Sequence, residues 1–149
     1  MRGSERFTQR ASTAITKAHD AAMGMGHSYV GTEHLLLGII REGEGLGARI
    51  LTDNALTDTV LTRMVTETVG RGVPGAPEQG LSPRARHVIE LAAEDASRLG
   101  HCYVGTEHIL MGILREADSA GARIIVAAGG DLNKIYTDIM DVFGRPEYK

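Results

Sequence analysis

The sequence is poor in cysteine and in aromatic residues. Its 149 residues include one cysteine and no tryptophan, and aromatic residues make up only 4% of the chain. A single cysteine excludes an internal disulfide framework and suits a reducing compartment, so we expect a cytoplasmic location. Because aromatic rings are scarce, the core must be built mainly from Ala, Ile, Leu, Val and Met, which favours close packing of helices.

Long apolar runs and a strong charge of one sign are also missing. The longest apolar stretches, such as LLLGII, fall far short of the roughly 20 residues that a membrane span needs. The N-terminal MRGSERFTQR has no apolar segment of the signal-peptide type. The formal net charge is -3, so no basic field exists to attract nucleic acid or anionic lipid. We expect neither nucleic acid nor a membrane as a partner.

Common catalytic and nucleotide-binding motifs are absent as well. The chain contains no GxxxxGK[ST], no GxSxG and no GxGxxG. We therefore expect no ATP hydrolysis by this chain, no enzymatic activity and no cofactor.

What is present is a duplication. GHSYVGTEHLLLGIIRE begins at Gly26 and GHCYVGTEHILMGILRE begins at Gly100, with 13 of 17 positions identical. In the same register, residues 7–50 match residues 81–124 without a gap, and half of the 44 pairs are identical. We expect one domain over 1–149, with repeats at 7–70 and 81–144. The stretch RGVPGAPEQG (71–80), with its glycines and prolines, indicates a linker.

Each repeat is predicted to form four helices. The first opens at Thr8 or Ser82 as N-cap, and the second follows with Thr32 or Thr106 as N-cap. A short third helix is expected at 46–54 and 120–128, and a fourth from Thr57 or Asp131. The first helices carry an apolar stripe at helical spacing: Ala11, Ala14, Ile15, Ala18 and Ala22, and then Ala85, Val88, Ile89, Ala92 and Ala96. No run alternates with period two, so we predict an all-α, eight-helix, pseudo-two-fold domain.

Repeated charged residues are the first candidates for a site. Glu33 and Glu107 lie in the first turn of the second helices, where the helix dipole stabilises a carboxylate. Arg10 and Arg84 lie at the start of the first helices, where a cation is mildly unfavourable. Either a surface salt bridge explains these arginines, or an anion binds at that helix terminus, held by free N–H groups, the Thr8 or Ser82 hydroxyl and the cation.

The histidines and the cysteine suggest less chemistry. His27, His34, His101 and His108 lack any metal-ligand spacing such as HExxH, so hydrogen-bonded structural histidines are the preferred interpretation and no metal site is expected. Cys102 stands opposite Ser28 in the other copy, so the fold does not require a thiol. A hydrolase that uses Cys102 with His101 or His108 remains only a weak alternative.

These motifs resemble the N-terminal Clp-N domain of ClpC-type Clp unfoldases, which precedes the AAA+ ATPase rings. The resemblance rests on four segments and covers essentially residues 6–144: RFTQRA (6–11), GHSYVGTEHLLLGIIREGEG (26–45), LSPRARHVIELA (81–92) and GHCYVGTEHILMGILRE (100–116). Within the family's pattern, Ser82 replaces the usual Thr, and READSAGAR replaces the usual REGEGVAAR.

The resemblance implies a non-catalytic docking platform. Family members recruit unfolded or tagged substrates and adaptor proteins to an unfoldase that feeds the ClpP protease, and some recognise phosphoarginine. Carried over by motif, one pocket per repeat would use Thr8 with Glu33, and Ser82 with Glu107. Arg10, Arg84, Thr32 and Thr106 are possible supporting residues. The family's hexamers form through the ATPase rings, so this domain by itself is expected to be a monomer.

A second function is compatible with the same resemblance. A stand-alone Clp-N protein would sequester adaptors, substrates or cyclic-peptide antibiotics from the unfoldase. An open reading frame that continues past Lys149 into a Walker A motif would exclude it.

Overall fold

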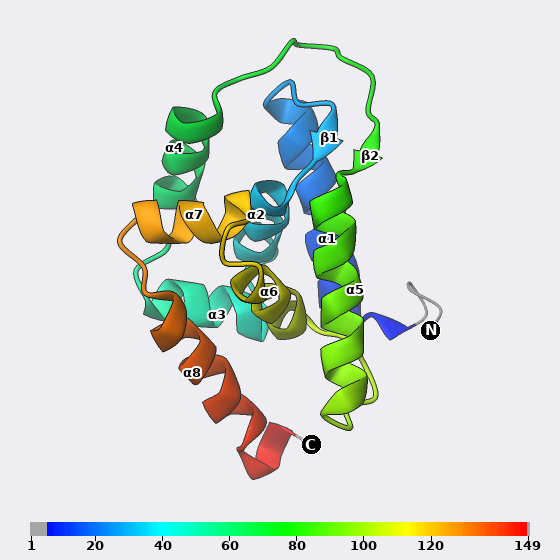
Figure 1. Ribbon diagram of the computed structural model, residues 1–149, viewed down its shortest axis with the longest axis vertical. Helices are drawn as coiled ribbons and strands as arrows, with labels where there is room; N and C mark the ends of the chain where they lie inside the picture. Colours follow the sequence, from blue (N-terminus) through cyan, green and yellow to red (C-terminus); the bar gives the residue numbers. More distant parts are fainter. Residues whose placement is uncertain (1–5, 149) are drawn as a thin grey trace.

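The chain folds as two copies of a four-helix unit, shown in Figure 1 by a computed structural model that describes residues 6–148. The first copy comprises α1 (Gln9–Gly24), α2 (Thr32–Glu42), α3 (Leu46–Asp53) and α4 (Asp58–Val69). The second comprises α5 (Pro83–Arg98), α6 (Thr106–Arg115), α7 (Ala120–Ala127) and α8 (Leu132–Phe143). A 3₁₀ helix, η2 (Pro146–Tyr148), follows α8. The predicted helical fold with its two repeats is confirmed.

The predicted starts of the first and fourth helices are confirmed by their caps. Thr8 Oγ1 accepts a hydrogen bond from the amide of Ala11, and Ser82 Oγ accepts one from Ala85. Thr57 and Asp131 cap α4 and α8 in the same way. Each cap satisfies a first-turn N–H that has no partner within the helix, which explains why the helices begin at these residues.

The predicted N-caps of the second helices are wrong by one residue. Gly31 and Gly105 are the N-caps of α2 and α6, and the threonines that follow are the first helical residues. In place of a hydroxyl, His34 Nδ1 accepts the hydrogen bond of the Gly31 amide at 2.9 Å. His108 Nδ1 accepts that of Gly105 at the same distance. An imidazole therefore occupies the place that Glu or Gln takes in a capping box.

The two threonines instead cap helices of the opposite repeat. Both are 2% exposed. Thr106 Oγ1 accepts from the amide of Gly47 in α3 at 3.0 Å, and Thr32 Oγ1 accepts from the amide of Gly121 in α7 at 2.8 Å. The hydroxyl of each repeat thus completes a helix terminus of the other, which ties the two halves together.

Thr106→Val is expected to lower the free energy of unfolding by about 1–2 kcal/mol, because it leaves the buried Gly47 amide without an acceptor at almost constant side-chain volume. Thr32→Val should cost less, since α7 also has Ser119 as a side-chain cap, whereas Gly45 offers α3 none. Urea denaturation of both variants tests this order. The exposed Thr52→Val is the control, and equal costs for all three variants would contradict a cross-repeat cap.

The core is centred on α2 and α6. In α2, every residue from His34 to Ile40 is buried, and α6 is buried along the equivalent stretch. The alanine stripe of α1 lies against α2. The closest approach is at Gly38, where an added Cβ would stand 2.1 Å from the carbonyl oxygen of Ala14. Ile15 and Ile89, which were predicted in the stripes, are only half-buried at the edge of the core.

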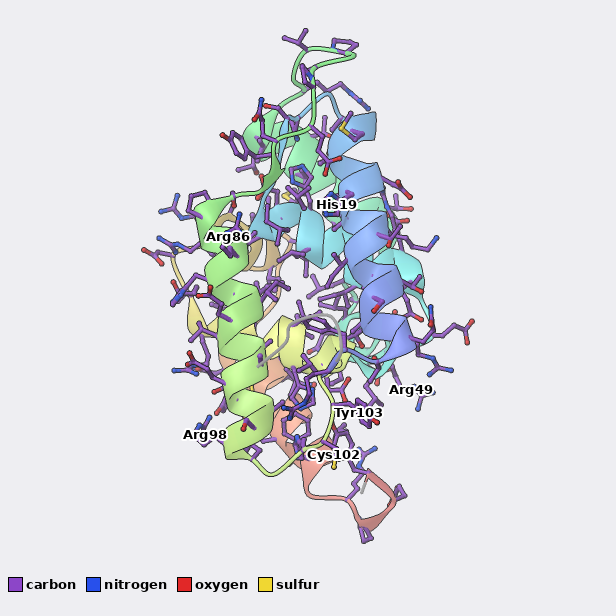
Figure 2. All side chains as sticks on the ribbon, turned by 90° about the vertical axis from the view of Figure 1, so that its right-hand side faces the viewer. His19, Arg49, Arg86, Arg98, Cys102 and Tyr103 are labelled. Carbon is purple, nitrogen blue, oxygen red and sulfur yellow. The ribbon has the colours of Figure 1, made fainter. Side chains whose placement is uncertain are left out.

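Two short parallel strand contacts cross between the repeats and were not predicted. β1 (Tyr29–Val30) pairs with β2 (Gly80–Leu81), and Phe7 forms an isolated bridge with Val104. Strands of two residues are too short for an alternating pattern to reveal them. Figures 1 and 2 show α1 and α5 running in opposite directions along one side of the molecule. As a result, the start of each of these helices lies beside the loop that follows the other.

Within residues 6–148, no helix combines the length and apolarity needed to cross a membrane.

Candidate functional site

Two hollows lie at these crossings, and we name them pocket A and pocket B. Pocket A, about 620 Å³, lies between the starts of α2 and α5, the linker and the α6–α7 loop. It is lined by Gly26, His27, Ser28, Tyr29, Gly31, Thr32, Glu33, His34, Gly72, Val73, Ala76, Ser82, Arg84, Asp118, Ser119 and Ala120. Pocket B, about 480 Å³, is lined by Thr8, Gly100, His101, Cys102, Tyr103, Gly105, Glu107 and Tyr148. Both volumes fall within the usual range of ligand sites.

The pockets correct the pairing that was expected within each repeat. Glu33 shares pocket A with Ser82, and Glu107 shares pocket B with Thr8. The reason is the strand contacts. Hydrogen bonds run from the Ser82 amide to the Val30 carbonyl and from the Thr8 amide to the Val104 carbonyl, both at 2.9 Å. Each helix start is thereby joined to the loop of the opposite repeat, so each pocket is composite.

The glycine in each VGTEH motif leaves room for the glutamate that follows it. A Cβ added to Gly31 would stand 2.3 Å from Glu33 Oε1, and one added to Gly105 would stand 2.5 Å from Glu107 Oε1. The carboxylate therefore folds back over the start of its own helix, where the helix dipole favours it. The side chain of Glu33 is 12% exposed, and Glu107 is 8% exposed.

The start of a long helix faces each carboxylate across the pocket. The Ser82 and Thr8 hydroxyls each accept one backbone hydrogen bond as N-caps, which leaves the hydroxyl proton available to a ligand. In α1 the amides of Gln9 and Arg10 have no acceptor within the helix, as in helix ends that bind anions. In α5 the corresponding amide is that of Arg84, because Pro83 at the first position has no N–H. Each pocket thus offers an acceptor on one side and donors on the other.

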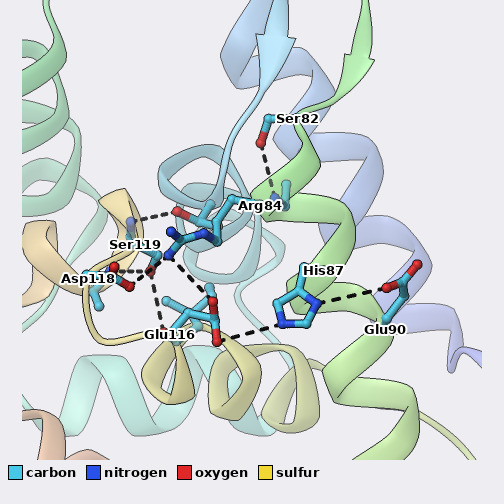
Figure 3. Close-up of polar contacts among 12 residues, drawn as sticks. Ser82, Arg84, His87, Glu90, Glu116, Asp118 and Ser119 are labelled. Atoms are coloured by element: carbon cyan, nitrogen blue, oxygen red, sulfur yellow. Dashed lines mark hydrogen bonds and ion pairs between the residues drawn. The ribbon is translucent and has the colours of Figure 1, made fainter.

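Arg84 and Asp118 line pocket A, and Figure 3 shows the polar contacts of Arg84 with Asp118 and Glu116. Arg84 Nη1 lies 2.8 Å from Asp118 Oδ1 and 3.5 Å from Glu116 Oε1. The hydrogen bond and charge of Arg84 lower the pKa of Asp118, and the pKa of Arg84 is raised in turn. The salt-bridge explanation of this arginine is therefore confirmed. Because Arg84 also lines the pocket, it remains a candidate for contacting a ligand.

The other supporting residues are placed less favourably. Arg10 Nη1 donates to the carbonyl oxygen of Glu44 at 2.9 Å, and Arg10 does not line pocket B. The hydroxyls of Thr32 and Thr106 are engaged by the cross-repeat caps described above.

The four repeated histidines form two hydrogen-bonded pairs. His27 Nδ1 lies 2.8 Å from His34 Nε2, and His101 Nδ1 lies 2.8 Å from His108 Nε2. Burial, followed by the neighbouring His27, lowers the pKa of His34 to about 4, and burial with His101 does the same for His108. The rings support the starts of α2 and α6, as expected of structural histidines. No cluster of three or more His, Cys, Asp or Glu side chains suited to a metal ion occurs among residues 6–148.

Cys102 is exposed and lines pocket B. Figure 2 places it beside Tyr103. The nearby His101 directs Nδ1 at His108, so the structure provides no support for a nucleophile and base pair.

Sequence reasoning missed three parts of the pockets. These are the linker residues Gly72, Val73 and Ala76, the Asp118 partner of Arg84, and Tyr148. Asp118 lies in READSAGAR, the segment that departs from the family pattern, and that departure was a usable signal. Tyr148 lies beyond the duplicated region, so no repeat comparison could point to it.

Comparisons with known proteins agree with the architecture. The family model described as the Clp repeat (R) N-terminal domain matches residues 6–128 and again 80–147. The chain is 41% identical over 142 residues to the negative regulator of genetic competence ClpC/MecB of Bacillus subtilis, and 40% identical to the chloroplastic chaperone protein ClpC1 of rice (Oryza sativa subsp. japonica). Each alignment covers 95% of this chain and 18% or 16% of the relative, so the chain spans less than a fifth of these proteins.

Among solved structures, the N-terminal domain of ClpD from Arabidopsis thaliana superimposes with a TM-score of 0.78 at 25% identity. That match covers 92% of this chain and 96% of the ClpD domain. The Hsp104 N-terminal domain of Candida albicans, at 20% identity, matches with a TM-score of 0.76 over 93% of this chain and 91% of its own, and shares the fold. With two matched repeats, crossed strand contacts and 40% identity over nearly its whole length, this chain belongs to the Clp repeat N-terminal domain family.

Proposed function

We propose that this chain is the docking domain of a ClpC-like unfoldase, which binds substrate and adaptor proteins, and that pockets A and B each bind a phosphoarginine side chain. One observation carries the proposal. In both pockets, a largely enclosed glutamate carboxylate faces the N-terminus of a 16-residue helix. The duplicated VGTEH motif supplies the carboxylate, and the opposite repeat supplies the helix.

The chemistry of phosphoarginine fits this arrangement. Its side chain joins a planar guanidinium directly to a phosphoryl group, so one ligand needs an acceptor and an anion site next to each other. Glu33 or Glu107 can accept a bidentate hydrogen bond from the guanidinium. The Thr8 hydroxyl with the Gln9 and Arg10 amides, or the Ser82 hydroxyl with the Arg84 amide, can bind the phosphoryl oxygens. In pocket A, Arg84 adds a cation beside that phosphate.

The charge of the pockets disfavours simpler phosphates. Pocket A contains the carboxylates of Glu33 and Asp118 and one guanidinium, that of Arg84, so its formal charge is negative. The acidic side chain among the lining residues of pocket B is Glu107. A phosphoserine offers no guanidinium to either glutamate, and its phosphate meets like charge at short range. Phosphoarginine should therefore bind in preference to phosphoserine. It should also bind in preference to arginine, because arginine lacks the phosphoryl group that the helix start would bind.

Calorimetric titration with free phosphoarginine should give two sites per chain. Glu33→Ala and Glu107→Ala should each reduce the stoichiometry to one, since each removes the guanidinium acceptor of a single pocket. Folding should persist, because a first-turn carboxylate contributes only about 0.3–1 kcal/mol through the helix dipole. Phosphoserine and arginine are the ligand controls. Unchanged stoichiometry in either variant would contradict the assignment of these pockets.

The composite construction adds a sharper control. In the Glu107→Ala background only pocket A remains, so Ser82→Ala should weaken phosphoarginine binding about 10-fold or more through the lost hydrogen bond to a charged group. Thr8→Ala in the same background should leave binding unchanged. If Thr8→Ala weakens binding in this background and Ser82→Ala does not, Glu33 acts with Thr8 of its own repeat and the composite pairing is wrong.

A further inference from the structure

The two pockets differ in what already occupies the glutamate. In pocket B, the hydroxyl of Tyr148 in η2 donates a hydrogen bond to Glu107 Oε2 at 2.7 Å. In pocket A, no side chain of residues 6–148 donates a hydrogen bond to Glu33, and His34 Nδ1, 4.0 Å from Glu33 Oε2, is itself the acceptor of the Gly31 amide. The carboxylate of pocket A is therefore open to a ligand, while that of pocket B has an internal partner.

Tyr148 is held in place by more than this hydrogen bond. Its ring lies 5.1 Å, centroid to centroid, from both His101 and Phe143, and the Phe143 ring also stacks on His108 at 5.1 Å. Such ring pairs contribute stability beyond their buried area. Burial and the bond to Glu107 both raise the pKa of the Tyr148 phenol, so it keeps the proton that it donates.

Tyr148 is the one lining residue of pocket B that has no equivalent in pocket A. Seven of the eight residues that line pocket B have a counterpart 74 positions away that lines pocket A. Tyr148 is the exception, because the same shift reaches Pro74 in the linker. Near that point pocket A is lined by Gly72, Val73 and Ala76, whose side chains offer no hydrogen-bond donor.

We propose that Tyr148 is an internal cap that competes with the ligand for Glu107, so that pocket A binds phosphoarginine without rearrangement and pocket B binds it only after η2 moves away. This inference rests on the proposed function and assigns a regulation to one of its two sites. A bidentate guanidinium needs both oxygens of Glu107, and the phenol already bonds Oε2, so the closed and the liganded state of pocket B compete. If the cap is closed in about 90% of molecules, the apparent affinity of pocket B falls about 10-fold.

The binding test isolates each pocket in turn. In the Glu33→Ala background, which leaves pocket B, Tyr148→Ala should raise the phosphoarginine affinity about 10-fold, and Tyr148→Phe should raise it by a smaller factor because the ring remains. In the Glu107→Ala background, which leaves pocket A, neither substitution should change the affinity. Tyr136→Phe on α8 is the matched control, since that ring lines neither pocket. Unchanged affinity of pocket B in Tyr148→Ala would overturn the competition.

A ligand-free measurement separates this inference from the proposed function. The carbon-13 resonance of the phenol Cζ of Tyr148, identified by its loss in Tyr148→Phe, should shift on Glu107→Gln and remain in place on Glu33→Gln. If the Tyr148 Cζ resonance does not shift on Glu107→Gln, Tyr148 does not bond Glu107 in solution, and the inference is overturned. If the resonance shifts but no variant binds phosphoarginine, the proposed ligand is wrong and the competition for it fails, while the cap itself stands.

Discussion

Replacing Gly38 by alanine is expected to destabilise the domain by about 2 kcal/mol or more. The new Cβ would stand 2.1 Å from the Ala14 carbonyl oxygen and 2.9 Å from the Ala18 amide nitrogen. Both are backbone atoms of α1, so relief requires the two helices to separate along the alanine stripe. Overpacking of a well-packed core typically costs 1–3 kcal/mol, and here it outweighs the gain of roughly 1 kcal/mol in helix propensity.

The repeat supplies the matched comparison. At the equivalent Gly112, the added Cβ would stand 2.8 Å from the Val88 carbonyl oxygen, so Gly112→Ala should cost less, about 1–2 kcal/mol. Gly24→Ala meets nothing within 4 Å and should be neutral or slightly stabilising. Urea denaturation of the three variants measures the order. A Gly38→Ala protein as stable as the wild type would mean that α1 and α2 are less closely packed than described.

Acidification from pH 7.5 to 4.5 is expected to lower the free energy of unfolding through His34 and His108, by on the order of 2 kcal/mol for each. Their folded pKa is about 4, against 6.5 in the unfolded chain, so the unfolded state binds more protons between these values. Stability should therefore be constant above about pH 6.5 and fall as the pH drops toward 4. The lowered pKa values of Asp118 and Asp138 act below their ordinary 3.8, outside this window.

Geometry explains why these rings resist a proton. The Gly31 amide donates to His34 Nδ1, so the neutral ring carries its hydrogen on Nε2 and donates it to His27. His27 Nε2 then donates to the carbonyl oxygen of Gly70 at 2.7 Å. This chain is complete when both rings are neutral. A further proton on His34 would remove the acceptor of the Gly31 amide, and one on His27 would set two N–H groups against each other.

The combined variant His34→Gln/His108→Gln tests the assignment of the pH dependence. Glutamine is the usual capping-box residue at this position and can still accept from the Gly31 or Gly105 amide, but it does not titrate. The variant should unfold with nearly equal free energy at pH 7.5 and 4.5. Substitution of the exposed His87 by Gln is the control and should leave the slope of the wild type. If the double variant keeps that slope, other groups are responsible for it.

The order of the helices could be predicted because N-cap residues mark where most of them begin and the apolar spacing marks which face is buried. Thr8, Ser82, Thr57 and Asp131 were recognised as N-caps from their residue type and from the apolar spacing that follows them. The error at Thr32 and Thr106 has a physical reason. Threonine is a common N-cap, and only the folded chain reveals that its hydroxyl is needed by an amide 89 or 59 residues away.

The residues of the candidate site could be predicted from the sequence, but not which glutamate shares a pocket with which hydroxyl. Glu33, Glu107, Thr8 and Ser82 were assigned to a pocket through the resemblance to the Clp-N family, by motif, and their chemistry suits a guanidinium and a phosphate. Their pairing depends on the short parallel contacts of Tyr29 with Gly80 and of Phe7 with Val104, which no local pattern encodes. The difference between the pockets depends on Tyr148, which lies outside the repeat.

By itself, the sequence determined the duplication, the eight helices, the helix caps of local origin and the positions of the two carboxylates. All of these depend on interactions within a few residues of each other, which periodicity and residue type reveal. The tertiary structure alone decided that the start of α1 and the start of α5 each lie beside a loop of the other repeat, that each pocket is lined by both repeats and that Tyr148 donates a hydrogen bond to Glu107. Those features depend on contacts between segments tens of residues apart, and such contacts form only when the two halves pack together.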